Sequence, residues 1–157
     1  MSEYCLLLRK DLRQALAPAQ WPEGIQLSPL SEELLPRAHA LLEQGYATGQ
    51  GSVDSLLDWQ HALRHDAEYD PQLCFVGLLD NNVVGVAQAW TSAYLKDLVV
   101  HPRLQGRGLG GALLNHVFSV FQQRGEPCMD LKVMEHNHPA RRLYQRHGML
   151  LIRREPL

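Results

Sequence analysis

The sequence has no long uninterrupted apolar run, no excess of charge of one sign and only three cysteines in 157 residues. No stretch approaches the roughly 18 apolar residues of a membrane-spanning helix. The apolar run within the first ten residues is too short for a secretion signal, and an acidic residue, Glu3, precedes it. A net charge of −2 lacks the basic excess typical of nucleic-acid and membrane-surface binding. These absences predict a cytoplasmic protein that binds neither nucleic acid nor membrane.

The cysteines and histidines indicate no metal site. Cys5, Cys74 and Cys128 are odd in number and widely spaced, which gives neither a disulfide framework nor a zinc site. Each lies among apolar residues, so we expect three small buried side chains. Two histidine pairs, 61 with 65 and 136 with 138, have ligand-like spacing but no third ligand nearby in the sequence, and we predict that no metal binds.

A glycine-rich stretch from Asp97 to Gly111 stands out in the middle of the chain. It opens with an apolar run that predicts a buried strand, and Pro102 ends strand pairing because it has no N–H to donate. An apolar pattern with spacings of three and four residues begins at Leu109 and predicts a helix. Between them, four glycines fall within six residues: Gly106, Gly108, Gly110 and Gly111.

A strand, a glycine-rich turn and a helix form an arrangement that binds phosphate. The first N–H groups of a helix have no intrahelical partner and lie at the positive end of its dipole. Glycines let a polyanion approach those N–H groups, and Arg107 adds a full positive charge. A tight turn into a buried helix is the alternative, but it accounts for neither the four glycines nor the arginine.

Two ligand classes use this geometry. Gly106-x-Gly108-x-x-Gly111, followed by Glu135, formally matches a dinucleotide fingerprint. That fold needs further strand–helix units after the glycines, and fewer than fifty residues follow Gly111. Too few residues therefore remain after Gly111 to form the further units of a dinucleotide-binding fold.

The second match is closer. Gln105-Gly-Arg-Gly-Leu-Gly110 resembles the Gln/Arg-x-x-Gly-x-Gly/Ala pyrophosphate loop of the GNAT superfamily of N-acetyltransferases. The stretch from Tyr94 to Pro102 resembles the strand before that loop. The stretch from Asn137 to Gly148 resembles the family's second motif, Asn-x-x-Ala-x-x-Leu-Tyr-x-x-x-Gly. The two motifs occur in the right order from Tyr94 to Met149.

The resemblance implies an α+β fold, with a mostly antiparallel mixed sheet of about six to seven strands and about four flanking helices. The strands at 94–100 and 128–134 would be parallel and splay apart. Other strands are predicted near 4–8, 25–27, 73–79, 83–90 and 150–153. Helices are predicted from caps at Ser28 or Ser31, at Ser52 or Asp54, and at Asn137, besides the helix at 109–121.

We expect a single domain over residues 1–157. The family usually adds a seventh strand after the last one predicted here, and the sequence leaves no room for it. Residues 1–24 form an N-terminal extension whose apolar run resembles that missing strand. Our hypothesis is that it fills the seventh position, either in its own sheet or in a partner's.

The implied activity is acetyl transfer from acetyl-CoA (coenzyme A) to an amine of a small molecule, peptide or protein. The alternative is a catalytically silent acyl-CoA-binding module. The oligomeric state, including a homodimer, and the acyl chain length stay open. The cofactor contacts that the resemblance implies are Leu98, Val99, Val100, Gln105, Gly106, Arg107, Gly108, Leu109, Gly110, Gly111, Asn137, Ala140 and Tyr144.

Two residues are predicted to be catalytic. Tyr144 corresponds to the family's general acid, which protonates the leaving thiolate or hydrogen-bonds to its sulfur. Asp97 is the first candidate for the base or the acceptor anchor, with Tyr94, Glu135, His101 and a water relay left open. Lys96 stands where diamine acetyltransferases have glutamate, which argues against a polyamine acceptor.

Residues 45–70 are expected to shape the acceptor pocket. Four side chains there could receive a cation, although packing on a helix face explains them equally well: Tyr46, Asp54, Asp58 and Trp59.

Overall fold

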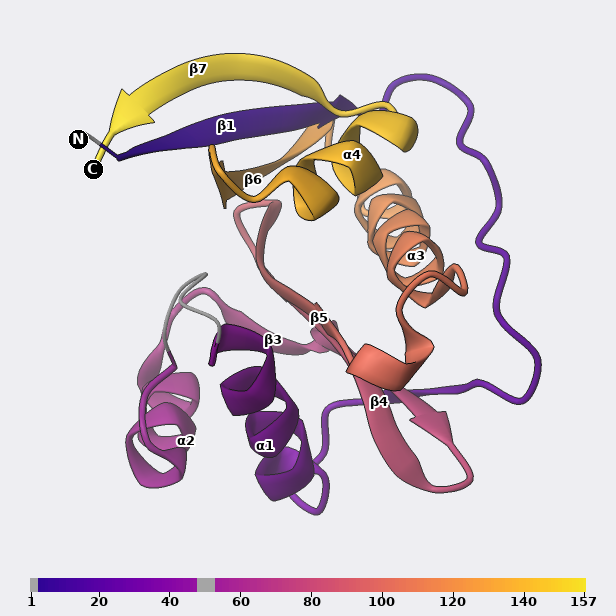
Figure 1. Ribbon diagram of the computed structural model, residues 1–157, viewed down its shortest axis with the longest axis vertical. Helices are drawn as coiled ribbons and strands as arrows, with labels where there is room; N and C mark the ends of the chain where they lie inside the picture. The colour runs from indigo at the N-terminus through magenta and orange to yellow at the C-terminus, as the bar shows by residue number, and fades with distance from the viewer. Residues whose placement is uncertain (1–2, 48–52) are drawn as a thin grey trace.

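The computed structural model describes residues 3–47 and 53–157, and these form one seven-stranded mixed sheet with four α-helices (Figure 1). The strand order is β2-β3-β4-β5-β6-β1-β7, and the β5–β6 pair is parallel whereas the other neighbours are antiparallel. This confirms the predicted α+β fold. The elements are β1 (Tyr4–Asp11), β2 (Gln26–Pro29), α1 (Leu35–Tyr46), α2 (Leu56–His65), β3 (Tyr69–Leu79), β4 (Asn82–Trp90), β5 (Tyr94–Val100), α3 (Leu109–Gln123), β6 (Cys128–Met134), α4 (His138–Arg146) and β7 (Leu150–Pro156).

Two apolar cores lie on opposite faces of the sheet. Along β3, Leu73 and Phe75 belong to the core under α3, whereas Cys74 and Val76 belong to the core under α1 and α2. Successive side chains of a strand point to opposite faces, so a strand buried on both sides is apolar at every position. This explains why β3 is a continuous apolar run without alternation from Leu73 to Leu79.

The N-terminal strand β1 lies between β6 and β7 and is antiparallel to both (Figure 1). Leu8 pairs with Leu131 on one side and with Leu151 on the other. Of the two positions considered for this segment, the structure shows the one within its own sheet. The strand is longer than expected and ends at Asp11, because its pairing with β6 continues to Asp11 opposite Cys128. Arg9 also makes a paired contact with Asp130 at 2.7 and 2.9 Å. This position leaves β7 as an edge strand.

Local signals placed β5 and β6 at their observed bounds, whereas β1, β3 and β7 are each longer by three or four residues than predicted and two helix starts differ. Asp80 and Asn81 have positive φ in the β3–β4 hairpin, as expected of these residue types. The predicted serine cap of α1 was wrong: its first residue follows Leu34, which makes no side-chain cap, and the Ser31 carbonyl accepts the N–H groups there. The cap of α2 is Ser55, not Asp54, whereas Ser52 lies outside the described residues.

The cysteines are free thiols. Cys5 and Cys74 are buried as expected, and burial raises the pKa of the Cys74 thiol to about 12. Cys128 is only half-buried, contrary to the prediction. It is the first residue of β6 and borders a surface pocket together with Arg13. None of the helices in the described part of the chain is long and apolar enough to cross a membrane.

Candidate active site

Strand β5 has a β-bulge close to the point where its parallel pairing with β6 ends. Asp97 pairs with Gln88 of β4 and Leu95 pairs with Ala89, so Lys96 is an extra residue on β5. A bulge bends its strand and increases the local twist. Pairing of β5 with β6 is confined to Tyr94 with Asp130 and Leu95 with Leu131. Beyond Leu95 the backbone groups of β5 that face β6 therefore have no ladder partner on that strand.

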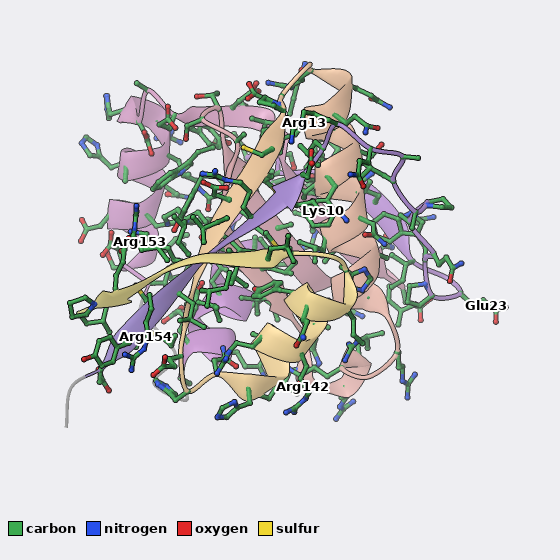
Figure 2. All side chains as sticks on the ribbon, turned by 90° about the horizontal axis from the view of Figure 1, so that it is seen from above. Lys10, Arg13, Glu23, Arg142, Arg153 and Arg154 are labelled. Carbon is green, nitrogen blue, oxygen red and sulfur yellow. The ribbon has the colours of Figure 1, made fainter. Side chains whose placement is uncertain are left out.

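The splayed strands border a cleft of about 1490 Å³. Its walls include the C-terminal end of α1, the loop before α3 and the inner face of α4. Arg142, labelled on α4 in Figure 2, also lines it. Most of the predicted site residues line this cleft: Asp97, Leu98, Val99, Val100, Gln105, Gly106, Gly108, Gly110, Gly111, Asn137, Ala140 and Tyr144.

Two predicted contacts do not line the cleft. The Leu109 side chain is fully buried in the core under α3, and Arg107 is exposed. The N–H of Leu109 belongs to the first turn of α3, which is where a phosphate would meet backbone donors. A role for Leu109 is therefore limited to its backbone.

The glycines of the loop have different structural roles. Gly106 and Gly108 have φ of +77° and +90°, and a Cβ added to either would meet no atom of the protein within 4 Å. Gly108 precedes α3 and no side chain caps this helix, so its first N–H groups stay available. A Cβ on Gly111, by contrast, would lie 2.5 Å from His147 Nε2. Gly106 and Gly108 keep a cradle open, and Gly111 lets α4 pack closely on α3.

The cradle fits a diphosphate group. Open space lies where side chains at Gly106 and Gly108 would be, beside the uncapped positive end of a 15-residue helix, α3. Gln105 Nε2 donates to the Val100 carbonyl at 3.2 Å and holds the loop against the end of β5. The same loop thus borders both the phosphate cradle and the unpaired edge of β5.

Asp97 is the buried carboxylate of the cleft, with 7% of its surface exposed. The Tyr46 hydroxyl donates a short hydrogen bond to Asp97 Oδ1, and Lys96 Nζ lies 3.4 Å from Oδ2. Burial and the Asp97 charge raise the pKa of Tyr46, so the phenol keeps its proton. Sequence reasoning considered Tyr46 only as a cation receptor, since no local signal brings together residues 51 positions apart.

Tyr144 lies on the cleft side of α4 and is 9% exposed. Burial, and secondarily the charge of Asp97, raises the pKa of its phenol to about 12. The phenol is therefore a proton donor at neutral pH. The helix is fixed at its start by Asn137, whose side chain accepts the Ala140 N–H at 3.3 Å.

The other candidate bases lie outside the cleft lining. Glu135 accepts from Arg154 at 2.5 and 3.0 Å, and this pairing lowers the pKa of its carboxyl. The Tyr94 ring stacks on Trp90, and burial raises the pKa of its phenol. His101 Nδ1 accepts the Arg103 N–H at 3.1 Å. Among these candidates only Asp97 combines burial with a place in the cleft.

Of the four residues considered for the acceptor pocket, only Tyr46 lines the cleft. Trp59 is buried in the core under α1 and α2, with its ring against His39. The Asp58 N–H bonds to Ser55 in the first turn of α2, and the Asp54 carbonyl lies 2.6 Å from the His39 ring. The helix-packing explanation therefore holds for Trp59, whereas the Asp54 and Asp58 side chains are exposed.

Comparison with known proteins gives a family that agrees with this geometry. Residues 36–149 match the model of the Acetyltransferase (GNAT) family. The chain belongs to the GNAT acetyltransferase family. The match spans both the glycine cradle and the Asn137–Gly148 motif, and so confirms the resemblance seen in the sequence.

Three relatives illustrate the similarity. An uncharacterized N-acetyltransferase, YhfO of Bacillus subtilis, is 39% identical over 54 residues, which are 34% of this chain and 36% of that protein. A GCN5-related N-acetyltransferase from Sphaerobacter thermophilus superposes with a TM-score of 0.85 at 23% identity. An aminoglycoside acetyltransferase from a soil metagenome, in complex with sisomicin, gives a TM-score of 0.63 at 20% identity over 80% of this chain and 88% of that one.

The Sphaerobacter protein is longer than this chain. The superposition with the Sphaerobacter protein covers 99% of this chain but 50% of that one, so this chain spans about half of its length. At such identities the structural likeness establishes the fold of the GNAT family and leaves the acceptor to be argued from the site itself.

Proposed function

We propose that this protein is an acetyl-CoA-dependent N-acetyltransferase that transfers the acetyl group directly to an amine. The observation that carries the proposal is one cleft that holds a phosphate cradle, an unpaired strand edge, a buried carboxylate and a protonated phenol. Bound acetyl-CoA would supply the acetyl group as a thioester. Each further part of the chemistry is assigned to residues of this chain.

The cofactor would be held mainly by backbone groups. The N–H groups of the cradle around Gly106 and Gly108 would bind the diphosphate. The space that a side chain at either glycine would occupy is open and can admit the ligand. The β6-facing N–H and C=O groups of Leu98 to Val100 would pair with the pantetheine arm as with another strand. A free N–H there can also stabilise negative charge that develops on a carbonyl oxygen.

Proton transfer is assigned to the two sides of the cleft. Asp97 would accept the proton that the attacking amine sheds, while the Tyr46 hydroxyl holds the carboxylate in place. Tyr144 would give its phenolic proton to the departing sulfur. Holding both reactants in the cleft makes the reaction effectively unimolecular, which is itself a large part of the rate enhancement.

The test is to measure acetyl-CoA binding by calorimetry and CoA release with a panel of amines. We expect binding and turnover in the wild type, and a Tyr144→Phe variant that loses rate while its acetyl-CoA affinity is retained. Tyr69→Phe, a half-buried tyrosine on β3 outside the cleft, is the matched control and should keep its rate.

Two outcomes contradict the proposal. If acetyl-CoA binds but no amine in the panel causes release of CoA, the protein is instead an acyl-CoA-binding module. A Tyr144→Phe variant that loses affinity as much as rate would show that the phenol serves binding and not proton donation.

A further inference from the structure

One lysine on each of β5 and β6 follows the last paired residue, where the two strands part. Leu95 pairs with Leu131 in the last position of the β5–β6 ladder, so the next residues, Lys96 and Lys132, flank the opening. Both line the cleft, with 38% and 43% of their side chains exposed. The bulge at Lys96 also brings its ammonium to within 3.4 Å of Asp97.

Four cationic side chains but a single carboxylate, Asp97, belong to the described lining of the cleft: Lys96, Lys132, Arg142 and Arg146. Glu155 on β7 is shared by Lys132 at 3.1 Å and by Arg153 at 2.5 Å, and Figure 2 shows Arg153 on β7. Asp97 is shared by Tyr46 and Lys96. Because Lys96 is partly solvated, its pair with Asp97 is weak, and a ligand can exchange for it at little cost.

On the basis of the proposed N-acetyltransferase function, we propose that the acceptor is a free amino acid, with its amine beside Asp97 and its carboxylate on Lys96 and Lys132. An amino acid carries opposite charges a few ångströms apart, as do the Asp97 carboxylate and the Lys96 ammonium. A zwitterion can therefore lie antiparallel to this pair and satisfy both charges.

The same charges discriminate against other amines. A polyamine would bring additional cations towards Lys96 and Lys132 in the cleft, and like charges repel one another. The N-terminus of a peptide has an amide where a free amino acid has its carboxylate, so it would bring no further anion to either lysine beyond Asp97 and Glu155. The carboxylate is thus the feature that selects the substrate.

The experiment compares each of the common amino acids with its C-terminal amide, with its decarboxylated amine and with spermidine, by CoA release at saturating acetyl-CoA. We expect kcat/KM for the preferred amino acid to exceed that for its own amide by about 10-fold or more, since a charge-assisted hydrogen bond is lost. Spermidine should be poorer still.

Two variants test the assignment to Lys96. Lys96→Met should raise KM about 10-fold more for the amino acid than for its amide, and should leave the affinity for acetyl-CoA unchanged. Lys96→Glu should reverse the preference and favour spermidine. Arg64→Met, which removes an exposed cation of α2 outside the cleft, is the control and should change none of these values.

The outcomes separate this inference from the proposed function. If amines are acetylated but amides or spermidine are preferred, or if Lys96→Met affects amide and amino acid alike, the amino-acid acceptor is wrong and the transferase stands. If acetyl-CoA does not bind, or no amine in the panel releases CoA, the proposed function itself is wrong.

Discussion

Replacement of Gly108 by alanine separates the backbone strain of the turn before α3 from the space that the turn keeps open. Gly108 has φ of +90°, a conformation in which an L side chain is strained by about 1–2 kcal/mol. A Cβ there meets no protein atom within 4 Å, so no clash adds to the strain. In a domain of this size 1 kcal/mol shifts Tm by about 2–4 °C, so we expect Tm to fall by about 2–8 °C.

The effect on the cofactor should be larger than the effect on stability. The added methyl group would stand in the cradle and keep a diphosphate away from the N–H groups of α3. Loss of one charge-assisted hydrogen bond costs about 1.5–3 kcal/mol, which corresponds to an affinity for acetyl-CoA lowered about 10- to 100-fold.

Gly125→Ala is the matched control. Gly125 follows α3 with φ of +84°, has the same open space around its missing Cβ, and lies outside the cleft lining. Both variants should show a similar fall in Tm by differential scanning fluorimetry, whereas calorimetry should show weakened acetyl-CoA binding in Gly108→Ala alone. Unchanged affinity in Gly108→Ala, or an equal loss in both, would refute the assignment of the cradle.

Further predictions concern stability. Asn137→Ala removes the cap of α4 and should cost about 1 kcal/mol by thermal unfolding, with Asn137→Asp restoring most of it. Leu113→Ala empties a fully buried position and should cost about 2–5 kcal/mol in urea titrations, whereas Leu150→Ala on the exposed edge strand should stay within about 0.5 kcal/mol. The folded state holds the Tyr144 proton more tightly than the unfolded chain does, because burial raises its pKa from 10 to about 12. The corresponding stability is complete below pH 10 and is lost as the pH rises from 10 to about 12, a loss that Tyr144→Phe should lack.

Local patterns predicted much of the fold because they act within a few residues. The bounds of β5 and β6, the glycine turn into α3 and the Asn137 cap all depend on apolar periodicity, proline and glycine, whose effects on φ and on backbone donors are local. The start of α1 was mispredicted because several polar residues near it can each act as a cap. None of them does so, and the helix instead begins after Leu34 without a side-chain cap.

The amino-acid sequence by itself determined most of the helices and strands, the glycine-rich turn before α3 and the position of the phenol in the second motif. Only the tertiary structure decided which groups meet: the Tyr46 hydroxyl on Asp97, the Arg154 partner that occupies Glu135, and the two lysines at the mouth of the splay. These contacts join residues that are distant in the chain, and they follow from strand order, the bulge at residue 96 and the insertion of β1 between β6 and β7. Pairing of that kind depends on which sheet edge is free once the other strands have packed, and no local pattern encodes it.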